Sequence, residues 1–188
     1  MAELFYVVGA SGVGKDSLLN YARSQLQFDT SVIFAHRYIT RSQDAGGENH
    51  VVLSEAEFAS RMGRGCFAMQ WYSHNTWYGI GVEIDQWLSK GFNVVVNGSR
   101  GYLDEAARNY PELTPVLITA ELELLRRRLQ NRGRESVDQI EQRLHSAQRL
   151  DQEIKHPRLH RIANNGILAQ AGEQLLQLIQ RETSQICA

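Results

Sequence analysis

The sequence of 188 residues predicts a three-layer α/β sandwich on a parallel sheet, with a phosphate-binding loop after its first strand. Two observations carry this prediction. Short apolar runs typical of buried strands alternate with amphipathic segments typical of helices along most of the chain. A glycine-rich loop that ends in a lysine stands between the first such run and the first such helix, which is the context of a nucleotide-phosphate site.

The first predicted strand is the apolar run 4–8, which leads directly into the glycine-rich loop. The later strand candidates are short, mostly apolar runs, and several end at turn residues such as Asn97-Gly98. These candidates are 33–35, 94–96, 116–119 and 159–163. Because helical segments fall between them, we expect a buried parallel sheet.

The predicted helices place apolar residues three or four positions apart, so that each has one apolar face. The segments are 18–26, 84–88, 122–129 and 168–179, and a further helix opens at Ser136. Ser136 and Gln139 have the spacing of a capping box. Gly133 is placed to end the helix before it.

The composition excludes several classes of function. The chain contains no run of about 18 apolar residues, and we expect no secretion signal and no membrane association. A net charge of −1 gives no electrostatic support for nucleic-acid binding. The two cysteines, Cys66 and Cys187, lie far apart and fit free thiols in a reducing cytoplasm. We therefore expect a cytoplasmic monomer or homodimer that acts on small molecules.

The chain length suits one domain with smaller parts inserted into it. We expect a core formed by residues 1–36 and 81–188. Residues from about 37 to about 80 break the strand–helix alternation and are rich in Gly, Arg, His, Tyr and Trp. They predict an inserted acceptor-binding lobe, because binding residues concentrate on such insertions. Residues from about 130 to about 145 predict an arginine-bearing lid.

The glycine-rich loop meets the spacing Gly-x4-Gly-Lys at Gly9, Gly14 and Lys15. Its backbone N–H groups and the helix N-terminus favour an anion, and Lys15 can reach the β- and γ-phosphates of a nucleotide. Lys15 is therefore the first predicted catalytic residue. The predicted nucleotide-binding residues of the loop are Gly9, Ala10, Ser11, Gly12, Val13, Gly14, Lys15, Asp16 and Ser17.

One position departs from the usual loop. The residue after the lysine is ordinarily Ser or Thr, which helps to hold Mg²⁺. Here it is Asp16, and a serine follows only at Ser17. Both are predicted metal ligands, directly or through water, and the sequence leaves open which one faces the metal.

Seven arginines lie between positions 126 and 149, although the chain has only three lysines. Arg132 and Arg134 flank Gly133 at the junction of two predicted helices, and Arg143 lies within the second helix. We predict these three arginines to be catalytic, because guanidinium groups stabilise the charge that spreads over a transferring phosphoryl group. A solvated helix surface is the alternative, and it is favoured within 126–128, because three consecutive positions cannot share one helical face.

Donors suited to an anionic acceptor gather in the predicted lobe and after the strand 94–96. Arg37 and Arg41 stand four positions apart beside a tyrosine, and arginine offers a planar fork to phosphate oxygens. Residues just past a strand's carboxyl end line the ligand crevice of an open α/β sheet. The predicted acceptor-binding residues are Arg37, Tyr38, Arg41, His50, Tyr78, Asn97, Ser99 and Arg100.

The order of these features resembles the guanylate kinase family over nearly the whole chain. Within that family, Gly-Lys-Asp-Ser at 14–17 and the segments 36–41, 48–50, 79–85 and 96–100 look like those of the ribose 1,5-bisphosphate phosphokinases of phosphonate catabolism. The resemblance implies a P-loop kinase that uses ATP and Mg²⁺ to phosphorylate ribose 1,5-bisphosphate to 5-phosphoribosyl diphosphate. It also implies that Asn164 and Asn165 approach the adenine.

Departures from guanylate kinases favour the sugar phosphate. Gln70 stands where those enzymes carry a guanine-reading Glu, and 97–100 replaces an Asp-rich stretch. The loss of acidic groups and the gain of Arg100 suit a small, highly anionic acceptor. Two alternatives stay open: a nucleoside monophosphate kinase for GMP or another nucleotide, and a catalytically inactive guanylate-kinase-like binding module. Such modules usually lose the loop lysine or the lid arginines, and this chain has both.

Overall fold

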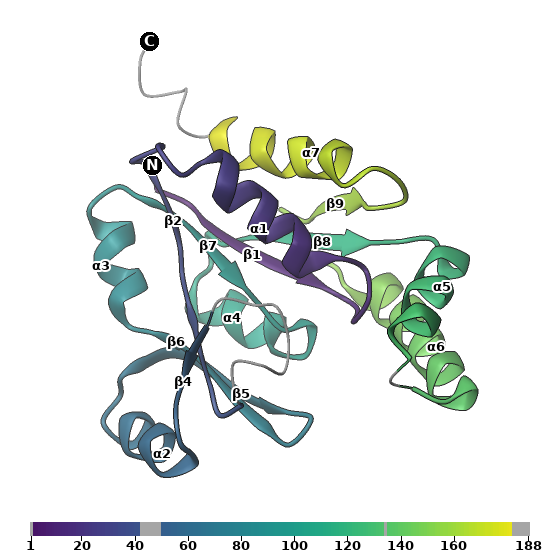
Figure 1. Ribbon diagram of the computed structural model, residues 1–188. Coiled ribbons are helices and arrows are strands. Elements are labelled where there is room, and N and C mark those ends of the chain that lie inside the picture. Colours follow the sequence, from purple (N-terminus) through teal and green to yellow (C-terminus); the bar gives the residue numbers. More distant parts are fainter. Residues whose placement is uncertain (1, 42–49, 134, 182–188) are drawn as a thin grey trace.

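The computed structural model describes residues 2–41, 50–133 and 135–181, and it has the predicted α/β fold. The main sheet has the strand order β2-β7-β1-β8-β9, and every neighbouring pair is parallel. Its strands are β1 (Leu4–Gly9), β2 (Val32–Phe34), β7 (Asn93–Asn97), β8 (Thr114–Thr119) and β9 (His160–Ala163). Because β1 is central, the loop that follows it lies in the middle of the sheet's carboxyl edge (Figure 1).

Helices cover both faces of the main sheet, as the alternation of side chains along β1 shows. Phe5 and Val7 belong to the apolar cluster formed with α1 (Lys15–Gln25) and α7 (Leu168–Arg181). Tyr6 and Val8 belong to the cluster on the other face, formed with α3 (Glu83–Ser89) and α4 (Leu103–Asn109). The strands are therefore buried on both sides, which gives the three layers seen in Figure 1. None of the helices in the described residues is long and apolar enough to span a bilayer.

A second, four-stranded sheet is formed between β2 and α3, and we call residues 37–81 the lobe. Its strand order is β4-β3-β6-β5. The elements are β3 (Arg37–Ile39), β4 (His50–Val52), α2 (Glu55–Gly63), β5 (Phe67–Ser73) and β6 (Thr76–Gly81). The two faces of this sheet differ. Trp71 and Tyr78 join the core cluster shared with the main sheet, whereas Phe67 and Trp77 stack on Phe58 of α2.

Two helices, α5 (Leu122–Arg132) and α6 (Val137–Glu153), follow β8 and pack on each other at one end of the molecule (Figure 1). We call them the helix pair. Gly133 ends α5 in the left-handed region with φ 61°, as predicted. The predicted capping box is also confirmed: the Ser136 N–H donates to Gln139 Oε1 at 2.9 Å, and the Gln139 N–H donates to Ser136 Oγ at 3.3 Å.

Two helices are not predicted by the sequence pattern. Helix α2 buries only Phe58, so it has no apolar periodicity, although Ser54 caps it by accepting from the Glu57 N–H. Helix α4 is short, buries only Leu103 and Ala106, and follows a 3₁₀ turn, η2 (Arg100–Tyr102). In both helices the apolar face is too small to produce a recognisable 3.6-residue period.

Candidate active site

The glycine-rich loop joins the end of β1 to the first turn of α1, as the motif predicts. We call residues 9–17 the P-loop. Gly14 is the residue before α1 and has φ 89°, which side chains disfavour. A Cβ at Gly14 would also collide with the side-chain nitrogen of Asn164. The loop therefore requires glycine at this position for its conformation and for its contact with the chain that follows β9.

Two side chains support the P-loop by donating hydrogen bonds to a single backbone carbonyl. The Val13 carbonyl accepts a hydrogen bond from Arg128 Nη1 at 3.1 Å and another from Asn164 Nδ2 at 2.7 Å. Arg128 Nη2 also donates to the Asn164 carbonyl at 3.0 Å. In a trans peptide the C=O and the next N–H point in opposite directions, so this anchor turns the Gly14 N–H toward the opposite side of the loop.

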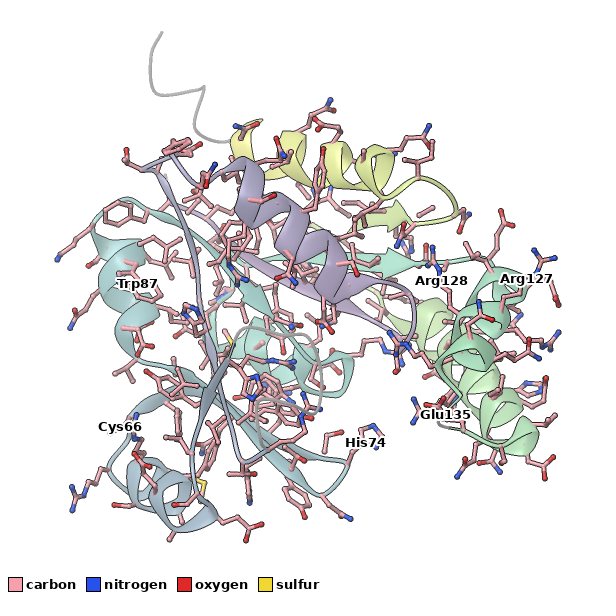
Figure 2. All side chains as sticks on the ribbon, in the orientation of Figure 1. Cys66, His74, Trp87, Arg127, Arg128 and Glu135 are labelled. Carbon is pink, nitrogen blue, oxygen red and sulfur yellow. The ribbon has the colours of Figure 1, made fainter. Side chains whose placement is uncertain are left out.

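Arg128 differs from its neighbours in the arginine run. Burial lowers the pKa of its guanidinium from the ordinary value. Figure 2 shows Arg128 on the side of α5 that faces the sheet, whereas Arg127 points away from the molecule. Arg126 pairs with Glu123 and Glu141 on the helix pair itself. The surface interpretation therefore holds for Arg126 and Arg127, and Arg128 is a structural support of the P-loop.

Three polar side chains meet where the P-loop approaches the carboxyl end of β7. Lys15 Nζ donates to Asn97 Oδ1 and, at 3.3 Å, to Asp16 Oδ1. Asn97 Nδ2 donates to the same Asp16 oxygen at 3.1 Å. Asn97 is only 7% exposed, and it links the end of β7 to the P-loop that follows β1. The sequence predicted all three residues in the site, and the structure brings them together.

The charge of Asp16 is controlled by this cluster. Burial alone would raise the pKa of its carboxyl, but the Lys15 ammonium, the Arg37 guanidinium and the Asn97 hydrogen bond hold that pKa below the ordinary value. The carboxylate is therefore ionised at neutral pH, and 54% of the side chain is exposed. Ser17 lies exposed on the first turn of α1. Asp16 is thus the one of the two predicted metal ligands that belongs to the cluster around Lys15.

The three predicted lid arginines have different positions. Arg143 of α6 reaches the P-loop, where its Nη1 donates to Ser11 Oγ at 3.1 Å and pairs with Glu135 Oε1 at 3.1 Å. Arg132 is the exposed last residue of α5. Arg134 lies outside the described residues. Of the two that the structure describes, only Arg143 contacts the P-loop.

In the lobe, Arg37 and Arg41 come from β3 and the residues just after it. The Arg37 guanidinium lies 4.9 Å from the ring centroid of Tyr78, within the range of a cation–π contact. Nε of Arg41 is buried and has no hydrogen-bond partner in the part of the chain that the structure describes. His50 is 3% exposed, and its Nε2 lies 3.2 Å from the Arg41 carbonyl oxygen. His50 therefore supports the backbone of Arg41 from inside the lobe.

The loop after β7 is fixed by Tyr6 of β1. The Tyr6 hydroxyl donates to the Ser99 carbonyl at 3.2 Å and accepts from the Ser99 N–H at 3.0 Å. Burial raises the pKa of Tyr6 well above its ordinary value, so the hydroxyl stays protonated. A Cβ at Gly98 would collide with the Tyr6 ring. Tyr6 thus sets the path of the backbone that carries Ser99 and Arg100.

Some predicted site residues lie apart from this cluster. Tyr38 is on the face of the lobe sheet that packs on Phe67, and its hydroxyl donates to Glu83 Oε1 at 3.2 Å. Burial and the nearby Glu83 carboxylate raise its pKa. Asn165 is bonded twice to Glu121, through the Glu121 N–H at 2.8 Å and the Glu121 carboxylate at 3.1 Å. The Tyr38 hydroxyl therefore contacts the first residue of α3, and Asn165 contacts the residue that precedes α5.

Sequence reasoning missed three residues that shape the site. Tyr6 is hidden in an apolar strand, where a tyrosine hydroxyl gives no separate signal. Arg128 is hidden in an arginine triplet, where the sequence gives no signal that separates it from Arg126 and Arg127. Glu135 sits beside the lid arginines as a single acidic residue, and only its burial and its pairing with Arg143 identify it.

Comparison with known proteins gives close relatives in sequence and a matching fold. No family model matches the chain. "Ribose 1,5-bisphosphate phosphokinase PhnN" of Psychromonas ingrahamii is 52% identical over 98% of this chain and 93% of its own length. Proteins of the same name from Thiobacillus denitrificans (53% identical, 94% of this chain and 92% of theirs) and Desulfomicrobium baculatum (52%, 97% and 97%) are equally similar. Among solved structures, a guanylate kinase from Anaplasma phagocytophilum matches with a TM-score of 0.71 and 14% identity, over 96% of this chain and 86% of that one.

Proposed function

Because the chain belongs to the ribose 1,5-bisphosphate phosphokinase family, we propose that it transfers the γ-phosphoryl group of ATP to ribose 1,5-bisphosphate. The products are ADP and 5-phosphoribosyl diphosphate. Sequence identity to relatives of that name, over nearly the whole chain, is the observation that carries the proposal. The fold is that of a P-loop kinase similar to guanylate kinases.

The reaction requires that the phosphates of the donor are held in place and that the charge on the transferring phosphoryl group is stabilised. An oxygen of the sugar 1-phosphate forms a bond to the γ-phosphorus, and the bond from that phosphorus to the β–γ bridging oxygen breaks, so that ADP leaves. The P-loop N–H groups and Lys15 bind the donor phosphates. Arg143 stands beside Ser11 of the loop, where its positive charge stabilises the transferring group.

The residues of the Lys15 cluster fit Mg²⁺. That ion takes one or two carboxylates together with phosphate oxygens and water. Asp16 supplies an ionised, half-exposed carboxylate next to the lysine that binds phosphate. When bound, the ion neutralises charge on the β- and γ-phosphate oxygens. We assign the metal contact to Asp16, and Asn97 orients that carboxylate through its side-chain amide.

The acceptor is assigned to the side of the P-loop that faces the lobe. Arg37 lies close enough to Asp16 to lower its pKa, so this arginine of the lobe contributes to the electrostatic field at the P-loop. Arg37, Arg41 and Arg100 are the cations that would bind the two acceptor phosphates. The attacking oxygen belongs to a phosphate that is largely ionised at neutral pH, so the reaction requires no strong general base. A cytoplasmic enzyme is part of the same proposal, which the free thiol of Cys66 supports.

A coupled assay of ADP release tests the proposal, with ribose 1,5-bisphosphate and GMP offered separately as acceptors. We expect turnover of the sugar phosphate and little turnover of GMP. Lys15→Ala should lower kcat about a thousandfold by removing a phosphate-binding cation. Lys90→Ala, which changes an exposed lysine after α3, is the matched control and should keep normal activity. GMP turnover without sugar-phosphate turnover would show a nucleoside monophosphate kinase instead.

A further inference from the structure

Glu135 is a buried carboxylate at the junction of α5 and α6. Its side chain is only 9% exposed, although Glu side chains are rarely buried unless they are paired. Oε1 lies 3.1 Å from Arg143 Nη1. Oε2 is buried and has no hydrogen-bond partner among the described residues. Figure 2 shows Glu135 on the inner side of the helix pair, turned toward the lobe.

The same nitrogen of Arg143 that pairs with Glu135 also donates to Ser11 Oγ at 3.1 Å. Glu135, Arg143 and the P-loop are therefore one connected chain of contacts. A long, 43% exposed arginine side chain would otherwise have many rotamers in water. The contact with Glu135 selects the rotamer in which the guanidinium lies at the P-loop.

Burying a carboxylate is costly, and its attraction to one partner often only offsets that cost. The Glu135–Arg143 pair is thus weak evidence for a role in stability. Its geometric effect is larger, because a carboxylate that pairs with a planar guanidinium restricts the directions in which the whole group can point. The unused Oε2 gives Glu135 the capacity for a second, parallel bond to the same guanidinium.

We propose that Glu135 is a positioning residue for phosphoryl transfer, which acts by holding the Arg143 guanidinium at the P-loop. Glu135 itself does not contact the reacting atoms. Removing the carboxylate leaves Arg143 charged but without a fixed orientation, so we expect kcat to fall while substrate binding is kept. The inference depends on the proposed function only for the choice of acceptor in the assay.

The test compares Glu135→Gln with a matched control, Glu141→Gln. Glu141 is also an acidic residue of the helix pair bonded to an arginine, with its oxygens 3.1 and 3.0 Å from Arg126 Nε and Nη2. We expect Glu135→Gln to lower kcat about tenfold, with KM for ATP and for the acceptor within about twofold of the wild type. Glu141→Gln should leave kcat within about twofold.

A double-mutant cycle separates positioning from a structural role. If Glu135 acts through Arg143, adding Glu135→Gln to Arg143→Gln lowers kcat no further. An equal tenfold loss in both backgrounds, or a normal kcat in Glu135→Gln, would overturn the proposal. The same double-mutant cycle is measured a second time with ATP hydrolysis in the absence of acceptor. Thermal unfolding and near-UV circular dichroism check that each variant is folded. A wild type inactive on ribose 1,5-bisphosphate would refute the proposed function, while the hydrolysis cycle still tests the role of Glu135.

Discussion

Removing the hydroxyl of Tyr6 tests whether β1 sets the position of the loop that follows β7. Tyr6→Phe keeps the buried ring and its contact with Gly98. It deletes the group that donates to the Ser99 carbonyl at 3.2 Å and accepts from the Ser99 N–H at 3.0 Å. The change is therefore confined to two hydrogen bonds on one residue of the loop that we assign to the acceptor.

The size of the effect follows from those two bonds. A neutral hydrogen bond contributes about 1 kcal/mol net, and an unsatisfied buried group costs about 1–3 kcal/mol. Ser99 is half-buried, so water recovers part of the loss. We expect the free energy of unfolding to fall by about 1–2 kcal/mol. Without the two bonds the loop after β7 is less ordered, and acceptor binding has to order it again. If this ordering costs about 1 kcal/mol, the acceptor KM rises about fivefold.

The assay combines urea unfolding with steady-state kinetics for each substrate. The control is Tyr21→Phe, which removes another tyrosine hydroxyl, bonded at 2.7 Å to Glu173 on the exposed contact of α1 with α7. The control should leave both KM values unchanged. The reasoning is refuted if Tyr6→Phe leaves the acceptor KM at the wild-type value, or raises the KM for ATP by the same factor.

Two further predictions concern the P-loop. Arg128→Met should raise the KM for ATP about tenfold, because it removes one of the two side-chain hydrogen bonds that hold the Val13 carbonyl. Arg127→Met, at the exposed neighbouring position, should not change that KM, and equal effects in steady-state kinetics would contradict the support role. Asn97→Ala should raise the pKa of Asp16 toward its ordinary value, which an NMR titration of the carboxyl carbon measures. Because the ionised form is favoured in the folded protein, the stability contributed by Asp16 is complete above its unfolded pKa and is lost as the pH falls through the folded pKa. The variant should lose that contribution at a higher pH than the wild type, and an unchanged titration would show that Asn97 does not hold the carboxylate.

The fold could be predicted from the sequence because its signals are local. The strands are short runs of mostly apolar residues, and the helix ends at Gly133 and Ser136 carry their own capping residues. The P-loop is equally local, since strand, glycines, lysine and helix are contiguous. Helices α2 and α4 bury too few apolar residues to show a period, so they became visible only once their contacts with the lobe and the main sheet were known.

The remainder of the site depends on contacts between distant segments. A residue in a helical run rotates by about 100° per position, so the sequence alone did not show which arginine of the run at 126–128 turns inward. The structure assigns that place to Arg128, which reaches Val13 and Asn164. Tyr38 is the reverse case, because the sequence groups it with Arg37 and the structure separates the two side chains. It stands next to Arg37 in the sequence, but alternation along β3 places it on the other face of the lobe sheet, because neighbouring strand residues point to opposite sides.

The aromatic residues of the lobe also determine what the protein's own fluorescence can report. The chain has three tryptophans, Trp71, Trp77 and Trp87, which lie in β5, β6 and α3. Trp71 stacks on Tyr78 with ring centroids 5.6 Å apart, and the Arg37 guanidinium lies over that tyrosine. The P-loop and the helix pair contain no tryptophan. Intrinsic tryptophan emission therefore reports on the lobe and on α3, and it does not report directly on the P-loop or the helix pair. A change in this emission on adding ATP alone would show, without any attached dye, that the lobe or α3 responds to binding elsewhere in the molecule.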